Sequence, residues 1–246
     1  MKRIGVLTSG GDTPGMNAAI RAVFKTGVDI DLQVMGIYHG YKGLIEGRVG
    51  YLAHADVESK MHKGGTILRT ARSEEFKTEG GIEKAISVLR AYEIEGLIVI
   101  GGDGSFKGAD ALGKRGIPVI GIPGTIDNDM GYTDFTFGFD TAVNNVMNEI
   151  YKIRDTMRAH DRVGVIEVMG RRCGDIALWA GVAGAADIIL VPERPLSWAD
   201  AANRLAANKL RGQLTSIVMI AEGAGKAEDF CEYCLLYTSP SPRDCS

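Results

Sequence analysis

The stretch "IPVIGIPGTIDND" (residues 117–129) combines a predicted strand with a group of carboxylates. Its first half, residues 117–122, is a short apolar run rich in isoleucine and valine, which predicts a buried parallel strand. Two carboxylates follow, Asp127 and Asp129. Close carboxylates repel each other and raise each other's pKa unless a metal ion or a proton compensates them. The alternative is an exposed turn, because Asp and Asn are common turn residues.

Similar apolar runs alternate with helical patterns along the chain. The predicted strands are residues 3–8, 33–38, 97–102, 117–122, 163–169, 188–192 and 216–223. Apolar residues keep helical spacing over residues 82–89 and 143–157. Thr13 followed by Pro14 predicts a helix start, and Ser197 with Asp200 resembles a capping box. Such alternation is typical of a doubly wound α/β fold with parallel strands.

The pattern changes near residue 139, where "FGFD" (residues 137–140) precedes a long predicted helix. We therefore expect two Rossmann-like, doubly wound parallel-sheet domains, at residues 1–138 and 139–230. From residue 231 onward neither strand alternation nor helical spacing continues, so residues 231–246 are expected to be an appended tail. Cys231 and Cys234 form one C-x-x-C pair without a second pair or a nearby His, which is weak evidence for zinc.

Composition indicates an ordinary globular protein. Hydrophobic residues are 45% and charged residues 24% of the 246 residues. The formal net charge of −3 argues against a nucleic acid or a membrane surface as the default partner. No apolar stretch approaches the length of a membrane span, and the first residues turn polar too early for a signal peptide, so we expect a cytoplasmic protein.

Two glycine-rich loops follow predicted strands, "TSGGDTPG" (residues 8–15) and "GGDGS" (residues 101–105). In an open parallel sheet, ligands bind beyond the carboxyl ends of the strands. The first loop is not a P-loop, because Met16 and Asn17 stand where Lys and Ser or Thr are required. In the second loop Asp103 is placed to hold Mg²⁺ beside a polyphosphate, whereas the alternative is a purely conformational turn.

Arginines add to these loops in "GGTILRTAR" (residues 64–72) and "MGRRCGD" (residues 169–175). Arg binds phosphate in a bidentate manner, although an isolated Arg is more often a solvated surface residue. Phosphate-cradling glycines, a carboxylate for Mg²⁺ and arginines are together the parts that phosphoryl transfer requires. One carboxylate of "TIDND" can then accept the proton of an attacking hydroxyl.

These motifs resemble those of the bacterial-type ATP-dependent 6-phosphofructokinases. The resemblance extends from Met1 to about Phe230 and includes "GVLTSGGDTPGMNAAIR", "GGTIL", "EFKTEGG", "EGLIVIGGDGS", "PGTIDND", "FGFD", "IEVMGR" and "GDIALWAG". It implies transfer of the γ-phosphate of ATP to the 1-hydroxyl of fructose 6-phosphate, a step of glycolysis, in a cleft between two domains. The alternatives are a pyrophosphate-dependent relative and a catalytically inert fragment.

The resemblance also implies residue roles. Asp127 would be the general base, Thr125 and Arg171 would stabilise the transferred phosphoryl group, and Asp103 would hold Mg²⁺. The ATP-binding residues would be Gly11, Arg72, Ser73, Gly102, Asp103, Gly104 and Ser105. The sugar-binding residues would be Thr125, Ile126, Asp127, Met169, Gly170, Arg171, Glu222 and, from a neighbouring subunit of a homotetramer, Arg162.

Family members bind ADP or phosphoenolpyruvate as effectors at a subunit interface. The matching residues are Arg21, Lys25, Arg154, Ala185, Asp187 and Arg211. Lys25 stands where the family often has Arg, and Gln213 and Leu214 stand where basic residues are common. Allosteric control is therefore less strongly implied than catalysis.

Two further expectations concern the donor and the end of the chain. Gly104 and Gly124 occupy positions that typically carry Asp and Lys in the pyrophosphate-dependent relatives, which favours ATP. The family continues beyond this chain's last residues, and Arg243 lacks the family's flanking residues, so it receives no role. Each Å² of apolar surface that stays exposed loses about 25 cal/mol of stabilisation, whereas the net stability of a protein is only ~5–15 kcal/mol. We therefore expect this chain alone to be inactive and poorly stable.

Overall fold

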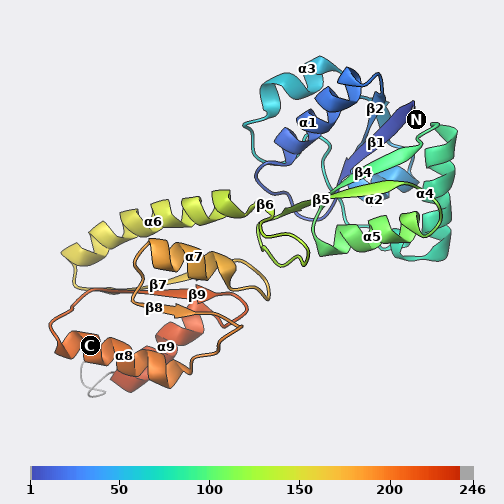
Figure 1. Ribbon diagram of the computed structural model, residues 1–246. Coiled ribbons are helices and arrows are strands. Elements are labelled where there is room, and N and C mark those ends of the chain that lie inside the picture. Colours follow the sequence, from blue (N-terminus) through green and yellow to red (C-terminus); the bar gives the residue numbers. More distant parts are fainter. Residues whose placement is uncertain (1, 239–246) are drawn as a thin grey trace. The chain divides into compact units, whose positions relative to one another are not determined.

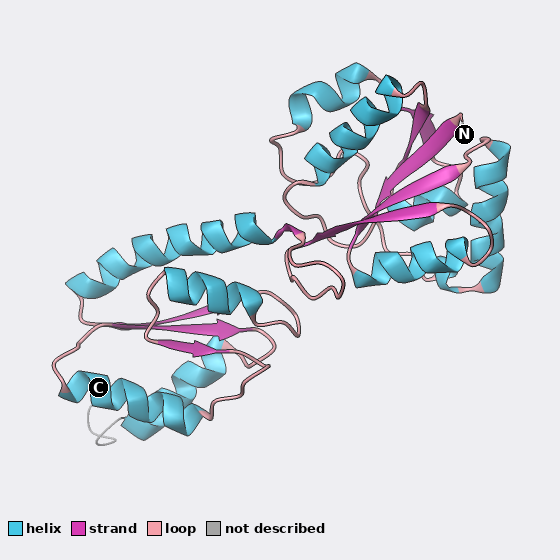
Figure 2. Ribbon diagram, in the orientation of Figure 1, coloured by secondary structure: helices cyan, strands magenta, loops and turns pink. Residues whose placement is uncertain are grey.

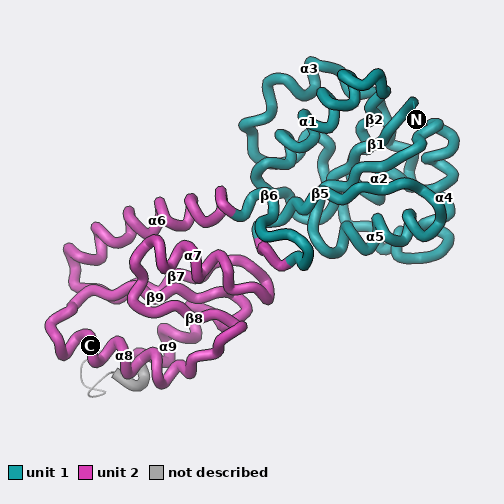
Figure 3. Tube along the Cα trace, in the orientation of Figure 1, with its two compact units in different colours: residues 1–126, 130–139 teal, residues 127–129, 140–246 magenta. Residues whose placement is uncertain are grey.

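The computed structural model describes residues 2–238, with side chains to Leu235, and it divides into two compact units (Figure 3). Unit 1 contains residues up to Ile126 together with Met130–Phe139. Unit 2 contains Asp127–Asp129 and the residues from Asp140 onward. The sequence did not predict that three residues between two stretches of unit 1 would group with unit 2.

Unit 1 is built on a six-stranded sheet in the order β3-β2-β1-β4-β5-β6 (Figure 1). The strands are β1 (Arg3–Thr8), β2 (Gln33–Ile37), β3 (Val49–Tyr51), β4 (Gly96–Gly101), β5 (Val119–Thr125) and β6 (Phe137–Gly138). Only β3 is antiparallel to its neighbour. The chain winds outward in opposite directions from β1 and β4, so the topological switch point lies between these two strands.

Helices cover both faces of this sheet (Figure 2). They are α1 (Met16–Asp29), α2 (Gly40–Ile45), α3 (His54–Val57), α4 (Glu79–Ala91) and α5 (Asp103–Gly113), with 3₁₀ turns η1 (Glu58–Lys60) and η2 (Glu75–Lys77). Because side chains alternate along a strand, Leu7 packs with α2, α4 and α5, and Val6 packs with α1 and α3. This confirms the doubly wound α/β fold.

Unit 2 has a three-stranded parallel sheet in the order β7-β9-β8. Its elements are α6 (Phe139–Ala159), β7 (Val163–Val168), α7 (Asp175–Ala183), β8 (Ile188–Leu190), α8 (Trp198–Leu210), β9 (Ser216–Ala221) and α9 (Ala227–Thr238). The central strand β9 is buried along its whole length. Helices α6 and α7 lie on one face, and α8 and α9 on the other (Figure 2), where Phe230 of α9 packs with Val218 and Ile220.

Three local predictions are wrong. Strand β5 is not buried, since Ile120 is 66% exposed: β6 pairs only with Gly124 and Thr125, which leaves the earlier part of β5 as a sheet edge. Helix α1 begins at Met16, because Thr13 donates its hydroxyl hydrogen bond to the carbonyl of Phe137 instead of capping a helix.

The third correction concerns the predicted tail. Helix α9 continues to Thr238, so residues 231–238 are helical. The acidic Glu228 and Asp229 in its first turn favour a helix start, and the buried Phe230 fixes it to the sheet. The remainder of that predicted tail lies outside the described residues. Within residues 2–238 no helix has both the length and the apolarity needed to cross a membrane.

Candidate functional site

In unit 1 the loops that follow β1 and β4 meet at the switch point. Ser9 donates its backbone N–H to the carbonyl of Ile100 at 3.0 Å, and the Ser105 hydroxyl donates to the carbonyl of Ser9 at 3.0 Å. A Cβ atom added at Gly101 would lie within 3.0 Å of both Ser105 Oγ and Ser9 O. The close approach of the two loops therefore requires glycine at position 101.

A third segment, residues 63–73, is bound to the first loop. The Thr70 hydroxyl donates to the carbonyl of Gly10 at 2.5 Å. The side chain of Asn17 donates to the carbonyl of Lys63 at 2.9 Å and accepts the N–H of Ile67 at 2.8 Å. Three stretches that are far apart in the sequence thus form one surface at the carboxyl end of the unit 1 sheet.

The residues expected to bind ATP lie in these three loops. They are Gly11, Arg72, Ser73, Gly102, Asp103, Gly104 and Ser105. A Cβ atom added at Gly11 or Gly104 would have no heavy atom within 4 Å, so the space beside both backbones is open within unit 1. The hydroxyl of Ser73 accepts the N–H of Phe76 at 3.2 Å and so has a structural partner already.

Asp103 is the candidate magnesium ligand. Its side chain is 57% exposed, and Oδ2 lies 2.7 Å from the ammonium of Lys107, one helical turn along α5. Among residues 2–238, no three or more His, Cys, Asp or Glu side chains group together as a metal site. One accessible carboxylate fits Mg²⁺, which keeps several waters and takes its other ligands from substrate phosphates.

In unit 2 the buried carboxylate of Asp127 lies beside a guanidinium group. Arg171 Nε is 3.3 Å from Asp127 Oδ2, and the two side chains are 67% and 9% exposed respectively. Arg171 has left-handed backbone geometry (φ 53°) and follows Gly170, whose φ is 143°. The exposed part of the guanidinium retains donors that can reach a second anion.

Two carboxylates hold the turn that carries Arg171. Glu222, directly after β9, accepts the backbone N–H groups of Gly170 and Arg171 through Oε1, at 3.0 Å and 2.6 Å. Glu193, which follows β8, accepts the N–H of Gly174 through Oε1 at 2.7 Å. Both ends of the turn between β7 and α7 are therefore bound to neighbouring strand ends.

Most of the expected sugar-binding residues share this region. Asp127, Gly170, Arg171 and Glu222 lie together, and the exposed Met169 begins the turn. Thr125 and Ile126 belong to unit 1, where the Thr136 hydroxyl donates to the carbonyl of Thr125 at 2.6 Å.

Arg162 is not brought to this region. It immediately precedes β7, whereas Met169 and Gly170 follow the other end of that strand. A strand of this length spans roughly 20 Å, so Arg162 of the same chain does not reach the turn along the strand.

Residues 127–129 also contact the start of α7, which the sequence did not predict. The Asn128 side chain donates through Nδ2 to Asp175 Oδ2 at 2.8 Å. "MGRRCGD" marks Asp175 as a residue after a strand, but nothing in the sequence pairs it with a residue 47 positions away. Cys173 Sγ lies 4.0 Å from the carbonyl oxygen of Asn128. Burial raises the pKa of this thiol, so the neutral thiol prevails at neutral pH.

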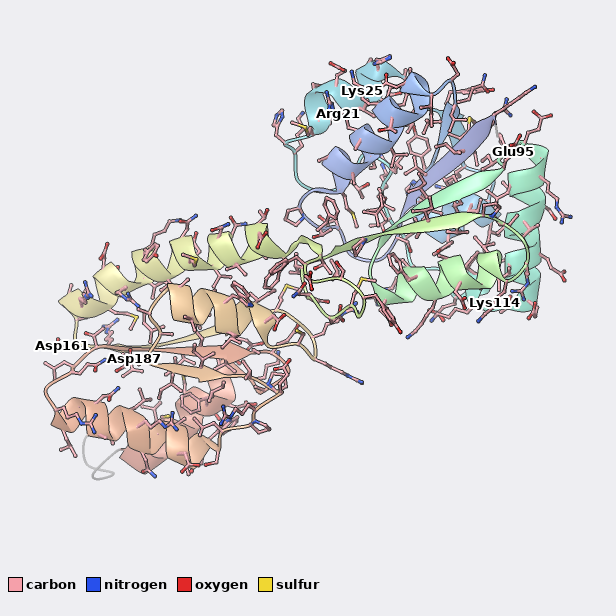
Figure 4. The ribbon with its side chains drawn as sticks, in the orientation of Figure 1. Arg21, Lys25, Glu95, Lys114, Asp161 and Asp187 are labelled. Carbon is pink, nitrogen blue, oxygen red and sulfur yellow. The ribbon has the colours of Figure 1, made fainter. Side chains whose placement is uncertain are left out.

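The expected effector residues fall in both units. In unit 1, Arg21 and Lys25 lie one turn apart on α1 (Figure 4). Lys25 Nζ is 2.6 Å from Glu58 Oε1, and this hydrogen bond lowers the pKa of the Glu58 carboxyl. Lys25 thus already has an anionic partner.

In unit 2 the expected effector residues are Arg154 on α6, Ala185 and Asp187 before β8, and Arg211 before β9. Asp187, labelled in Figure 4, accepts from Gln213 Nε2 at 2.6 Å and from the N–H of Ile217 at 2.8 Å. Arg154 donates to the carbonyl groups of Gly184 and of Ala185, the latter at 2.8 Å. Arg211 is the C-cap residue directly after α8, and Leu214 is exposed.

Known proteins match both the sequence and the fold. Residues 3–238 match the family described as Phosphofructokinase. A curated ATP-dependent 6-phosphofructokinase from Clostridium novyi (strain NT) is 55% identical over 228 residues, which are 93% of this chain and 72% of the relative. The solved phosphofructokinase of Saccharomyces cerevisiae superposes with a TM-score of 0.89 at 35% identity, over 97% of this chain and 37% of its own.

A more distant structure is similar in fold alone. A pyrophosphate-dependent phosphofructokinase from Marinobacter aquaeolei superposes with a TM-score of 0.83 at 23% identity, over 97% of this chain and 66% of its own.

Proposed function

The chain belongs to the phosphofructokinase family, and on that premise we propose that it transfers the γ-phosphoryl group of ATP to the 1-hydroxyl of fructose 6-phosphate. The products are ADP and fructose 1,6-bisphosphate. One observation carries this proposal: 55% identity over 93% of the chain to a relative named for the ATP-dependent reaction. The fold by itself would not suffice, because one fold serves many reactions.

Unit 1 supplies the groups that hold ATP. The open backbones at Gly11 and Gly104 lie at the switch point and at the start of α5, where backbone N–H groups favour phosphate. Asp103 would hold Mg²⁺ together with the phosphates of ATP. The bound ion neutralises negative charge on the phosphate oxygens during transfer.

Unit 2 supplies the groups that act on the sugar. The 1-hydroxyl oxygen bonds to the γ-phosphorus while its proton passes to the Asp127 carboxylate, and the bond from phosphorus to ADP breaks. Arg171 donates to the phosphoryl group during transfer, and Thr125 of unit 1 contributes its hydroxyl. Because Glu222 Oε1 binds the backbone of Gly170 and Arg171, Oε2 is the oxygen assigned to a sugar hydroxyl.

Two glycines support ATP over pyrophosphate. Gly104 leaves open space where an Asp side chain would extend toward the phosphates. A Cβ atom at Gly124 would lie 3.1 Å from Ile100 Cγ2, so a Lys side chain there would require the neighbouring side chains to shift. Pyrophosphate is the alternative donor, and an assay with both donors distinguishes it from ATP.

A donor assay tests the function. The assay uses a full-length counterpart, in which residues 1–230 of this chain are continued by the C-terminal part of a curated relative, because the chain spans 72% of such a relative. The counterpart is mixed with Mg²⁺, fructose 6-phosphate and either ATP or pyrophosphate, and fructose 1,6-bisphosphate is measured. We expect turnover with ATP, none with pyrophosphate, and none when fructose 1-phosphate replaces the sugar, because its 1-hydroxyl is blocked. Turnover with pyrophosphate alone would overturn the choice of donor, and the absence of turnover with either would overturn the proposed reaction.

The proposal extends to assembly, effectors and location. In a homotetramer Arg162 serves the sugar phosphate of a neighbouring subunit, which is supported by its position at the opposite end of β7 from Gly170. ADP or phosphoenolpyruvate binds the effector residues by competing with Glu58 for Lys25. The reaction takes place in the cytoplasm, as expected of glycolysis. Sedimentation with and without ADP measures the assembly and its response.

A further inference from the structure

The segment Asp127–Asp129 is attached to unit 2 by side-chain contacts, although the chain on both sides of it belongs to unit 1 (Figure 3). Arg171 lies beside the Asp127 carboxylate, and Asp175 accepts the hydrogen bond of Asn128 at 2.8 Å. The first contact belongs to the proposed reaction. The second involves no residue to which the reaction has so far given a role.

The backbone of Asn128 explains why a side-chain restraint at this position matters. Asn128 has left-handed geometry (φ 53°), a conformation that Asn tolerates better than most residues but that still costs energy. The direction of the Asp127 side chain depends on this local backbone. A hydrogen bond from the Asn128 amide to a residue elsewhere in unit 2 selects one conformation of the segment.

Asp175 is a firmly held acceptor. It is the first residue of α7, in which Leu178 donates its N–H to the carbonyl of Gly174 at 2.9 Å. The N–H of Gly174 is in turn bound by Glu193 at 2.7 Å. An acceptor on a rigid helix end can therefore fix the position of the loop that it binds.

We propose that Asp175 is a positioning residue of phosphoryl transfer: by holding the Asn128 amide it keeps the Asp127 carboxylate aimed at the reacting hydroxyl and beside Arg171. Asp175 itself touches no reacting atom. The inference rests on the proposed function, because Asp127 must be the base for its orientation to affect the rate.

A purely structural role for Asp175 is the competing explanation. A carboxylate in the first turn of a helix stabilises that helix wherever it stands. Asp200 provides a matched control, because it occupies the first turn of α8 and its Oδ2 accepts from the Ser197 hydroxyl at 2.6 Å. Asp200→Ala should lower the melting temperature without changing kcat, at a temperature where the variant is folded.

Kinetics of the full-length counterpart separate the two roles. Asp175→Ala should lower kcat by roughly 10–100-fold with the KM for ATP changed by less than about threefold, because misplacement of a base affects the chemical step. Asp175→Asn keeps an acceptor oxygen and should restore most of kcat. Asn128→Ala should match Asp175→Ala, and the double variant should be no slower than the slower single variant. An Asp175→Ala enzyme with unchanged kcat would overturn the proposal.

Nuclear magnetic resonance gives a readout that does not need activity. The side-chain amide signal of Asn128 should move to the position of a water-exposed amide in Asp175→Ala, stay in place in Asp175→Asn, and be unaffected by Asp200→Ala. An amide signal that does not respond to Asp175→Ala would refute the hydrogen bond. If the unsubstituted full-length counterpart forms no fructose 1,6-bisphosphate, the proposed function fails, and the amide signal still decides whether Asp175 positions the segment.

Discussion

The guanidinium of Arg171 lies against the buried carboxylate of Asp127, with Nε 3.3 Å from Oδ2. Asp129, two residues later, is exposed to solvent. The two carboxylates of "TIDND" therefore have different environments, and an exposed turn describes only the second. The pair places a carboxylate and a guanidinium at one point in unit 2, an arrangement that suits the proposed transfer to a hydroxyl.

We predict that Asp127→Ser in the full-length counterpart lowers kcat by roughly 10²–10⁴-fold, the usual loss for a general base. ATP binding should persist, because the groups assigned to ATP belong to unit 1. Steady-state kinetics and equilibrium titration with ATP measure the two effects. Asp129→Ser is the matched control and should leave kcat within a few-fold of wild type. Retained activity in Asp127→Ser would remove this residue from the base role.

Two substitutions at Glu222 should separate its contribution to stability from its contribution to binding fructose 6-phosphate. Glu222→Ala removes the acceptor of the Gly170 and Arg171 N–H groups and should destabilise the chain by about 1 kcal/mol. Glu222→Gln keeps an acceptor oxygen, so its urea midpoint should stay near that of wild type, while both variants raise the KM for fructose 6-phosphate. Equal urea midpoints for Glu222→Ala and wild type would show that these hydrogen bonds contribute no stability.

Two glycine substitutions test the contact between the loops that follow β1 and β4. Gly101→Ala places a methyl group within 3.0 Å of Ser105 Oγ and Ser9 O and should destabilise by roughly 1–3 kcal/mol. Gly113→Ala, at the end of α5, meets no heavy atom within 4 Å and should stabilise by about 0.5 kcal/mol. Urea unfolding of both variants measures the difference. A Gly101→Ala midpoint at or above that of wild type contradicts the close approach of the loops.

The local sequence pattern correctly predicted those strands and helix starts that depend on neighbouring residues. The strand predicted at residues 3–8 is β1 (Arg3–Thr8), and Ser197 caps α8 by accepting the N–H of Asp200 at 3.1 Å. The burial of β5 could not be predicted, because it depends on how far β6 extends along it. The helical state of residues 231–238 depends likewise on long-range packing of Phe230.

The residues of the candidate site likewise divide into those that local sequence pattern predicts and those that depend on distant contacts. Loops rich in Gly and Asp at predicted strand ends made Asp103, Asp127 and Arg171 candidates, and each of these residues follows a strand end in the structure. Their roles remain predictions. The residues that hold these loops, Asp175 and Glu193, act through hydrogen bonds to distant parts of the chain. Hydrophobic periodicity carries no information about such bonds.

The start of α9 should make stability depend on pH. Glu167 of β7 accepts from Lys226 Nζ at 2.7 Å and from the N–H of Ala227 at 3.0 Å, and these bonds lower the pKa of its carboxyl below the ordinary value of 4.5. A carboxyl with a lowered pKa in the folded state stabilises the fold above its unfolded pKa. That contribution is lost as the pH falls through the lowered folded value.

Glu167→Gln should therefore melt below wild type at neutral pH, and the difference should shrink as the pH falls below 4.5. Thermal melts across this range measure the effect. Lys226→Gln removes the first cause of the lowered pKa but leaves the N–H of Ala227, so it should lose only part of the pH dependence. Because the pair is partly exposed, high salt should weaken the effect of Lys226 more than that of the backbone hydrogen bond. A difference between wild type and Glu167→Gln that stays constant through this pH range would mean that the ionised carboxylate contributes nothing specific to the attachment of α9.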